Sequence, residues 1–357
     1  MRVCEGAGRH FARHPPRRGR GLDAPRYLVR KKVAPTAILR SLVNNKKDSL
    51  LVVARIKIVS DMPIPLQSTP LGSVIQITYE RVLECRGKRP HRINFARTQQ
   101  NEPKRALEGE SWVGSFSVHF EKTIRPLFRA ATNLPLFPSR QSREGQEPGV
   151  WRSIHTEEEF SRIQDWVTAQ GTLVFLRDCL DLSLALDYNF VDVDGSYTPV
   201  GELEHKAKTS QDANALEILS GLLIDRISGL PFFRDATKVA AVPAAKGKAY
   251  DLPRELATRV ATALSKEDLT SRFAFHGEKG KVKDCRLEKK WPLLESAELR
   301  LSGSDLGGSS VILIDDKYQS GTTMQYVAMK LQIAGAKRVF GISLVKTLRD
   351  GDNVATK

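Results

Sequence analysis

The stretch VILIDDKYQSGTT, residues 311–323, decides the fold of this chain. Its apolar run, which starts one residue earlier at Ser310, is typical of a strand that is buried on both faces of a parallel sheet. The run ends in two adjacent acids, Asp315 and Asp316, and a short loop then leads to a helix that opens at Gly321. A buried strand followed by a tight loop and a helix is typical of an α/β protein.

Strand and helix patterns alternate on both sides of this stretch. Apolar, β-rich runs predict strands over 237–242, 310–314 and 338–345, and helical spacing predicts helices over 157–169, 213–227, 252–264 and 322–334. We therefore predict an α/β fold in which a parallel twisted sheet carries flanking helices. The preceding N-terminal region is basic and poorly patterned, with candidate strands at 50–60 and 73–84.

The positive charge of the chain lies in its first half. The 357 residues carry a net charge of +15, and residues 1–150 alone hold 28 Lys and Arg against 12 Asp and Glu. Such a segment can bind nucleic acid through nonspecific phosphate contacts. A solvated basic leader is the plainer interpretation, because no groove-reading or aromatic pattern accompanies the charge.

Neither the apolar runs nor the cysteines indicate a membrane or an oxidising compartment. No run approaches the roughly 18 apolar residues that span a bilayer. The cysteines Cys4, Cys85, Cys179 and Cys285 are far apart in the sequence, and no pair has the C-x-x-C spacing. This argues against a zinc ribbon and against a disulfide framework. We therefore expect a soluble, cytoplasmic protein without a membrane partner.

These patterns divide the chain into five segments. We expect a disordered basic arm at 1–35, a small domain or extension of unknown role at 36–132, a linker at 133–150, a hood segment at 151–210 and the main α/β domain at 211–357. The linker is rich in proline, glycine and polar residues. Met62 is the only methionine between Met1 and Met324, which leaves a later translation start open.

The loop after the two acids carries groups that suit a sugar phosphate. A helix N-terminus offers backbone N–H groups and a positive dipole end to a phosphate. Gly321 lets the backbone come close, and the hydroxyls of Ser320, Thr322 and Thr323 add donors. Adjacent carboxylates can accept hydrogen bonds from sugar hydroxyls or hold magnesium through water. An ordinary strand-to-helix turn with Ser and Thr caps is the alternative. The P-loop and dinucleotide-binding patterns are both absent.

This stretch resembles the PRPP-binding signature of type I phosphoribosyltransferases, in which an apolar strand, two acids and a short loop precede Thr-Gly-x-Thr. Ser320 replaces the first Thr, and Lys317 stands where the family usually has an apolar residue. The resemblance implies that Asp315 and Asp316 bind the ribose hydroxyls and, indirectly, Mg²⁺. It implies that the 5-phosphate is bound by Gln319, Ser320, Gly321, Thr322 and Thr323.

Two further stretches resemble parts of the same family. VAAVPAAKG, residues 239–247, looks like the strand and loop that bind pyrophosphate, and this implies contacts from Ala245, Lys246 and Gly247. A plain strand-to-helix turn is the alternative. EKGKVKDCRLEKKW, residues 278–291, looks like the mobile loop that closes over PRPP, which implies a role for Lys281, Lys283 and Arg286. An ordinary solvated basic loop is the alternative there.

Within the family, the segments at 187–189, 197–203 and 206–208 resemble the ComF-like branch, although its N-terminal zinc ribbon is absent. The implied function is transfer of a 5-phosphoribosyl group from PRPP to an unknown acceptor base, a reaction of nucleotide metabolism. A homodimer is one possible assembly. His205 and His276 are candidate general bases. One alternative is an inactive PRPP or nucleotide sensor that binds nucleic acid through residues 1–150. The other is an α/β domain whose two acids bind only a metal.

Overall fold

The computed structural model describes residues 71–87, 92–139, 149–278, 285, 287–303 and 305–348. The basic arm predicted at 1–35 lies outside the described residues. So do the strand predicted at 50–60 and the first part of the small domain predicted at 36–132.

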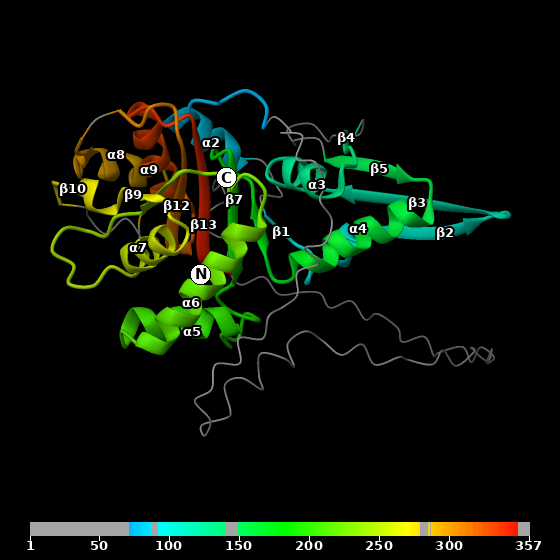
Figure 1. The fold of residues 1–357 in the computed structure, drawn as a ribbon, viewed down its shortest axis with the longest axis horizontal. Coiled ribbons are helices and arrows are strands. Elements are labelled where there is room, and N and C mark those ends of the chain that lie inside the picture. Colours follow the sequence, from blue (N-terminus) through cyan, green and yellow to red (C-terminus); the bar gives the residue numbers. More distant parts are fainter. Residues whose placement is uncertain are drawn as a thin grey trace, which may run out of the picture. The chain divides into compact units, whose positions relative to one another are not determined.

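A seven-stranded sheet forms the centre of the described chain (Figure 1). Its spatial order is β1 (Arg92–Asn94), β6 (Val174–Leu176), β7 (Leu182–Tyr188), β13 (Arg338–Lys346), β12 (Ser310–Tyr318), β8 (Lys238–Ala241) and β9 (Glu267–Asp268). Strands β7, β13, β12, β8 and β9 run parallel, while β1 and β6 are antiparallel to their neighbours. The predicted α/β class with a mostly parallel sheet is therefore confirmed.

Helices cover both faces of this sheet. Side chains alternate along a strand, so neighbouring residues of β12 belong to different cores. Ile312 and Ile314 belong to the core that contains α6 (Ala213–Gly229) and α7 (Leu252–Ala263). Val311 and Leu313 belong to the opposite core, which contains α8 (Leu287–Ser296) and α9 (Thr322–Ile333). The strand predicted at 310–314 and the helices predicted at 213–227, 252–264 and 322–334 are confirmed to within a few residues.

The strand predicted at 73–84 is wrong, because α2 (Tyr79–Gly87) forms over much of that range. Tyr79, Val82 and Cys85 recur at helical spacing and face the second core. The Tyr79 ring lies 5.6 Å from the ring of Trp291 on α8, and Val82 is fully buried. Packing on the domain therefore favours a helix from Tyr79, although the β-branched residues at 74–78 favour a strand just before it.

A second, antiparallel sheet has the order β2 (Lys104–Glu108), β3 (Ser111–Val118), β5 (Val150–Ile154) and β4 (Phe137–Pro138). Helices α3 (Ile124–Thr132) and α4 (Glu157–Gln170) pack beside it, and their residues share one core with the central sheet. The Trp166 ring contacts the rings of Phe95, Phe128 and Phe175 at 5.0–6.0 Å. The segment predicted as a linker, 133–150, contains β4 and the first residue of β5.

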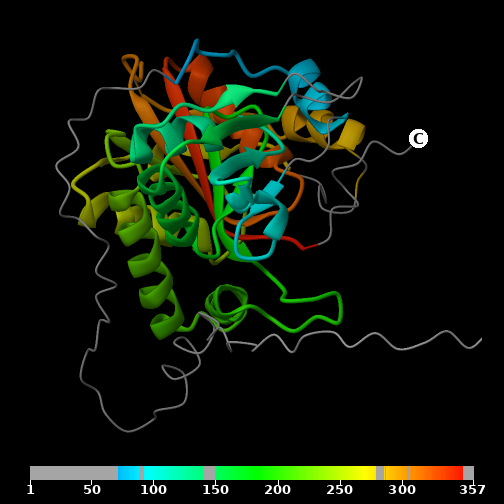
Figure 2. The ribbon, with the colours of Figure 1, turned by 90° about the vertical axis from the view of Figure 1, so that its right-hand side faces the viewer.

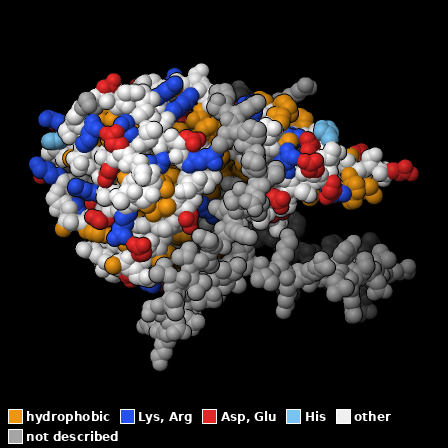
Figure 3. All heavy atoms as spheres, viewed as in Figure 1, with side chains coloured by type: hydrophobic (Ala, Val, Ile, Leu, Met, Phe, Trp, Pro, Cys, Tyr) orange, Lys and Arg blue, Asp and Glu red, His pale blue; other side chains and the backbone are white. Residues whose placement is uncertain are grey.

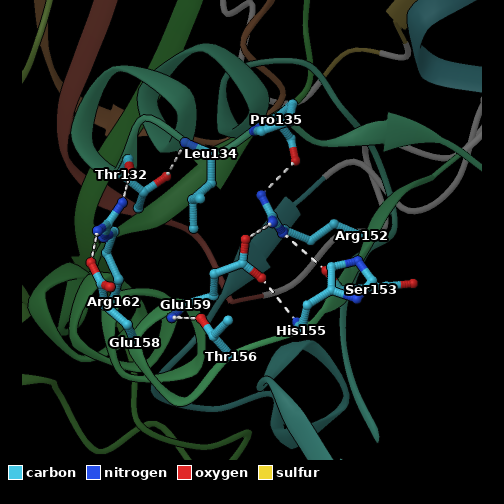
Figure 4. A network of polar contacts seen from close by, with 10 residues as sticks. All are labelled: Thr132, Leu134, Pro135, Arg152, Ser153, His155, Thr156, Glu158, Glu159 and Arg162. Atoms are coloured by element: carbon cyan, nitrogen blue, oxygen red, sulfur yellow. Dashed lines mark hydrogen bonds and ion pairs between the residues drawn. The ribbon is translucent and has the colours of Figure 1, made fainter.

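A buried arginine joins β5 to α4 and to the end of α3 (Figure 4). Arg152 is 6% exposed, and its guanidinium donates to a Glu159 carboxylate oxygen at 2.7 Å and to the Pro135 carbonyl at 3.2 Å. The second Glu159 oxygen accepts the backbone N–H of His155, which is the main cause of the lowered pKa of Glu159. Thr156 caps α4 by accepting the Glu159 N–H. The ion pair of Arg152 with Glu159, together with its hydrogen bonds, thus connects the second sheet to its helices.

The segment predicted as a hood, 151–210, contributes two strands to the central sheet, β6 and β7. The sheet therefore begins before the predicted boundary at residue 211. Helix α5 (Pro199–Thr209) follows β7 and contacts both β7 and β13. A small sheet of β10 (Phe273–Phe275) and β11 (Leu299–Leu301) flanks α8.

Exposed apolar side chains occur near the turn of the β2–β3 hairpin, where Leu107 and Trp112 pair across the strands (Figure 3). The Arg105 guanidinium lies 4.0 Å from the Trp112 ring and covers part of it. Among the helices of the described residues, none combines the length and apolar character that a bilayer crossing requires.

Candidate functional site

The predicted double acid lies at the carboxyl edge of the parallel strands. Asp315 and Asp316 are still within β12, which continues to Tyr318, and only the turn Gln319–Gly321 separates the strand from α9. The short loop predicted after the two acids is therefore this turn, and Lys317 and Tyr318 still belong to the strand. In open α/β sheets this edge is where ligands bind.

Gly321 makes this turn possible. Its φ of 69° is left-handed, and a Cβ at this position would overlap the phenol of Tyr318. The Tyr318 hydroxyl donates to Asp178 Oδ2 at 2.9 Å, which holds the ring against the glycine. Because glycine is the N-cap residue, α9 starts without the side-chain oxygen that caps α4, α5 and α6. The turn therefore lies at the positive end of a helix, where backbone N–H groups favour an anion.

Hydroxyls and a buried cation surround the turn. The hydroxyls of Ser320 and Thr322 lie 3.0 Å apart and are buried, while Gln319 and Thr323 are half-buried. The ammonium group of Lys290, on α8, lies 3.4 Å from Ser320 Oγ, and Lys290 is only 2% exposed. Lys290 was not among the predicted residues, because its position on a separate helix leaves no local signal in the sequence.

The two acids are part of a charge network that reaches α5. Lys208 forms an ion pair with Asp316 and lies 3.6 Å from Glu204, and Lys317 pairs with the other Glu204 oxygen at 3.1 Å. Glu204 is 1% exposed and Asp316 is 8% exposed. Burial lowers the pKa of Lys208, but the nearby carboxylates outweigh this effect and raise it above its usual value. Lys208 therefore remains a cation in contact with the predicted ribose-binding acid.

Helix α5 brings these charges to the carboxyl edge. Figure 2 shows β13, in red, running toward the end of the sheet where α5, in green, lies. Pro199 and the Thr198 cap start the helix, and Gly201 lets its first turn approach the Asn189 carbonyl. The fold therefore carries the helix from the end of β7 to the end of β12.

Asp315 and Asp187 add carboxylates at the same edge. Asp315 lies opposite Ser343 of β13, is half-buried and accepts the Asp316 N–H at 2.9 Å. Asp187, near the end of β7, is 4% exposed and accepts the Tyr188 N–H at 2.6 Å. Burial raises the pKa of Asp187 to about 6. The edge thus holds a carboxyl group whose pKa lies above that of an ordinary aspartate.

The predicted pyrophosphate loop follows β8, the parallel neighbour of β12. Ala245, Lys246 and Gly247 are exposed, and the φ of Gly247 is 79°. The Ala244 N–H donates to Asp251 Oδ2 at 3.0 Å, which ties the loop to the start of α7. The structure therefore brings this loop and the double acid to one edge, on adjacent strands.

The predicted mobile-loop residues Lys281, Lys283 and Arg286 lie outside the described residues. The two candidate bases are exposed. The His205 ring lies 5.1 Å from the Tyr197 ring and is tilted against it, and the His276 carbonyl accepts a hydrogen bond from the Lys246 ammonium at 3.3 Å.

Within the described ranges, no group of three or more His, Cys, Asp or Glu side chains is arranged to hold a metal ion. Magnesium is commonly held by one or two carboxylates together with waters and substrate phosphates. The chemistry of Asp315 and Asp316 would suit that kind of site, because they are adjacent carboxylates near the carboxyl end of β12 whose charges both raise the pKa of Lys208.

No protein-family model matches this chain, and no curated protein matches it. Solved structures similar to this chain include adenine phosphoribosyltransferase from Trypanosoma brucei in complex with AMP, pyrophosphate and ribose-5-phosphate. The sequence identity is 13% and the TM-score is 0.28, and the match covers 47% of this chain and 85% of that one. Adenine phosphoribosyltransferase from Thermoanaerobacter pseudethanolicus has 18% identity, a TM-score of 0.26, and coverage of 42% and 86%. Orotate phosphoribosyltransferase from Aeropyrum pernix has 15% identity, a TM-score of 0.26, and coverage of 51% and 80%.

Proposed function

We propose that this chain binds PRPP with Mg²⁺ and transfers the 5-phosphoribosyl group to an acceptor base, with release of pyrophosphate. The observation that carries the proposal is the junction of β12 and α9. There, two carboxylates at the carboxyl edge are followed by a turn of only three residues and an N-cap glycine. The sequence resemblance to type I phosphoribosyltransferases rests on the same residues, and the resemblance to their ComF-like branch rests on the segments at 187–189, 197–203 and 206–208.

Each part of such a ligand has a candidate partner. The turn Gln319–Gly321 and the start of α9 suit the 5-phosphate, with Lys290 adding a buried positive charge. Asp315 and Asp316 suit the ribose hydroxyls, and Lys246 and the backbone near Gly247 suit the diphosphate. Bound Mg²⁺ would neutralise phosphate charge. The chain itself would act mainly by positioning the ligand and offering fixed donors to departing pyrophosphate.

Calorimetric titration of PRPP with Mg²⁺ into the full chain tests the proposal. We expect saturable binding that an Asp315→Asn, Asp316→Asn double variant loses, because amides cannot replace the ionised acceptors. Lys206→Met, on the outer side of α5, serves as the matched surface control. The Tm of each protein is measured alongside, so that a folding defect is separated from a binding defect.

Turnover is then measured as pyrophosphate release with a panel of purine and pyrimidine bases. Release that depends on one base supports the transferase. Binding without turnover for any base would overturn the transferase and retain a PRPP-binding protein. A folded wild-type chain that shows no binding at millimolar PRPP would overturn both.

A further inference from the structure

Two cysteines that are 94 residues apart in the sequence meet in the structure. Cys85 lies on α2 and is half-buried, and Cys179 follows β6 and is 5% exposed. Their Sγ atoms are 3.5 Å apart. The sequence spacing argued against disulfides, but spacing along the chain says nothing about a contact made by packing α2 onto the sheet.

We propose that Cys85 and Cys179 are a redox-active dithiol that closes to an intramolecular disulfide. A disulfide has a sulfur–sulfur distance of about 2.05 Å, so closure requires a movement of roughly 1.5 Å between two side chains already in contact. Cys85 is the more accessible of the two thiols and is the one that an oxidant reaches first.

The electrostatic surroundings support these roles. The hydrogen bond from Cys179 has the largest effect and lowers the pKa of Cys85, whereas burial raises it; of the nearby charges, Lys122 and Arg177 lower the pKa and Asp178 raises it. Together they lower the pKa of Cys85 to about 7. The hydrogen bond to Cys85 and burial raise the pKa of Cys179, so that it stays a thiol until Cys85 has reacted. Cys85 is therefore the attacking sulfur and Cys179 the resolving one.

Hydrogen peroxide is the oxidant in the proposed reaction. The Cys85 thiolate attacks the peroxide oxygen, the O–O bond breaks, and Cys85 becomes a sulfenic acid while the leaving hydroxide takes a proton to form water. The Cys179 sulfur then attacks the Cys85 sulfur, and the sulfenic oxygen leaves as a second water. Two thiols lose two electrons in total, and one peroxide is reduced to two waters.

The dithiol is linked to the turn between β12 and α9. The Cys179 N–H donates to Gln325 Oε1 at 3.0 Å, and the Gln325 amide donates to the Gly321 carbonyl at 3.2 Å. The preceding residue, Asp178, accepts the Tyr318 hydroxyl. Movement of Cys179 toward Cys85 therefore loosens contacts that hold the turn on both sides.

The test treats the reduced full chain with hydrogen peroxide, blocks the remaining thiols with N-ethylmaleimide and maps disulfide-linked peptides by mass spectrometry. We expect one linked pair, Cys85 with Cys179, with Cys285 still alkylated. The rate should rise with pH up to about 8 and then level off, as expected for a thiolate with a pKa of about 7. A linkage of Cys85 to Cys285 or Cys4, or Cys85 oxidised with Cys179 still free, would overturn the proposal.

Cys85→Ser is the matched variant, because residue 85 is half-buried and tolerates an oxygen better than residue 179. It should keep the wild-type Tm and leave Cys179 unoxidised. Hydrogen exchange of the amides at 321–325 measures the link to the turn without any ligand. Oxidation should speed that exchange several-fold in the wild type and not in Cys85→Ser. Unchanged exchange in a fully oxidised wild type would overturn the link and leave the dithiol standing.

Discussion

Asp187 is a carboxyl group whose burial has a measurable effect on stability. Its pKa is raised by burial from 3.8 to about 6, so the folded chain holds this proton more tightly than the unfolded chain. The free energy of unfolding should therefore fall as the pH rises from about 4 to 6, and the full penalty should be present above pH 6.

Asp187→Asn should remove this penalty while keeping the oxygen that accepts the Tyr188 N–H. We expect a gain of about 2–3 kcal/mol at pH 8 and little change at pH 4, measured by urea unfolding at both pH values. Asp192→Asn, in the exposed loop that follows, is the control and should change neither value. A variant that is equally stabilised at pH 4 and pH 8 would show that burial of the charge is not the cause.

Gly321 is the other residue whose role can be isolated. Alanine there must adopt a left-handed φ and overlap the Tyr318 ring, so we expect a loss of about 1–3 kcal/mol and weaker PRPP binding. Gly221, in the middle of α6, has open space around its Cβ position. Gly221→Ala should therefore stabilise the chain by about 0.5–1 kcal/mol. Thermal unfolding of both variants makes the comparison, and similar losses at the two sites would contradict it.

At the scale of elements, α5 carries two lysines that differ in what they contact. Lys208 is ion-paired to the buried acid Asp316, while Lys206 pairs with the exposed Glu202 one turn back on the helix surface. Removal of Lys208 leaves Asp316 and the buried Glu204 short of a counter-charge. Removal of Lys206 leaves a carboxylate that water solvates.

We therefore expect Lys208→Met to cost about 2 kcal/mol, less than a fully buried pair because a third of the side chain is exposed. It should also weaken PRPP binding at least tenfold. Lys206→Met should leave the urea midpoint and the binding unchanged. If the two substitutions changed stability and PRPP binding equally, the charge of Lys208 would have no specific role at the site.

The elements also show what a sequence can and cannot predict. The strand, turn and helix around residues 310–333 were predicted because their apolar run, acids and glycine are neighbours in the chain. The contacts of Lys290 with Ser320, and of Lys208 with Asp316, join residues 30 and 108 positions apart. No local pattern records such pairs. The same reason explains α2, which follows directly on a β-branched run at 74–78 and is held by packing against α8, far away in the sequence.

At the scale of the whole molecule, the second sheet with its helices shares a hydrophobic core with one face of the central sheet. Phe95, Phe116 and Phe128 pack with Trp166 and Phe175, and the same cluster continues to Ile342 and Val345 in β13. The N-terminal half therefore supplies one wall of the core that lies under the central sheet. Strand β1 also pairs with β6 and covers what would otherwise be an open sheet edge.

A chain that starts at residue 151 should consequently fail to fold as a stable domain, even though the predicted linker ends there. It lacks α2 and β1. It also exposes Trp166 and Phe175, aromatic side chains that each bury roughly 150–250 Å² in a folded protein. We expect a chain of residues 71–357 to unfold cooperatively and the chain of residues 151–357 to aggregate or melt without a sharp transition. Differential scanning calorimetry compares the two. A sharp transition of the shorter chain at the same Tm would mean that residues 71–150 pack on the sheet without stabilising it, and that the carboxyl-edge site can be studied apart from them.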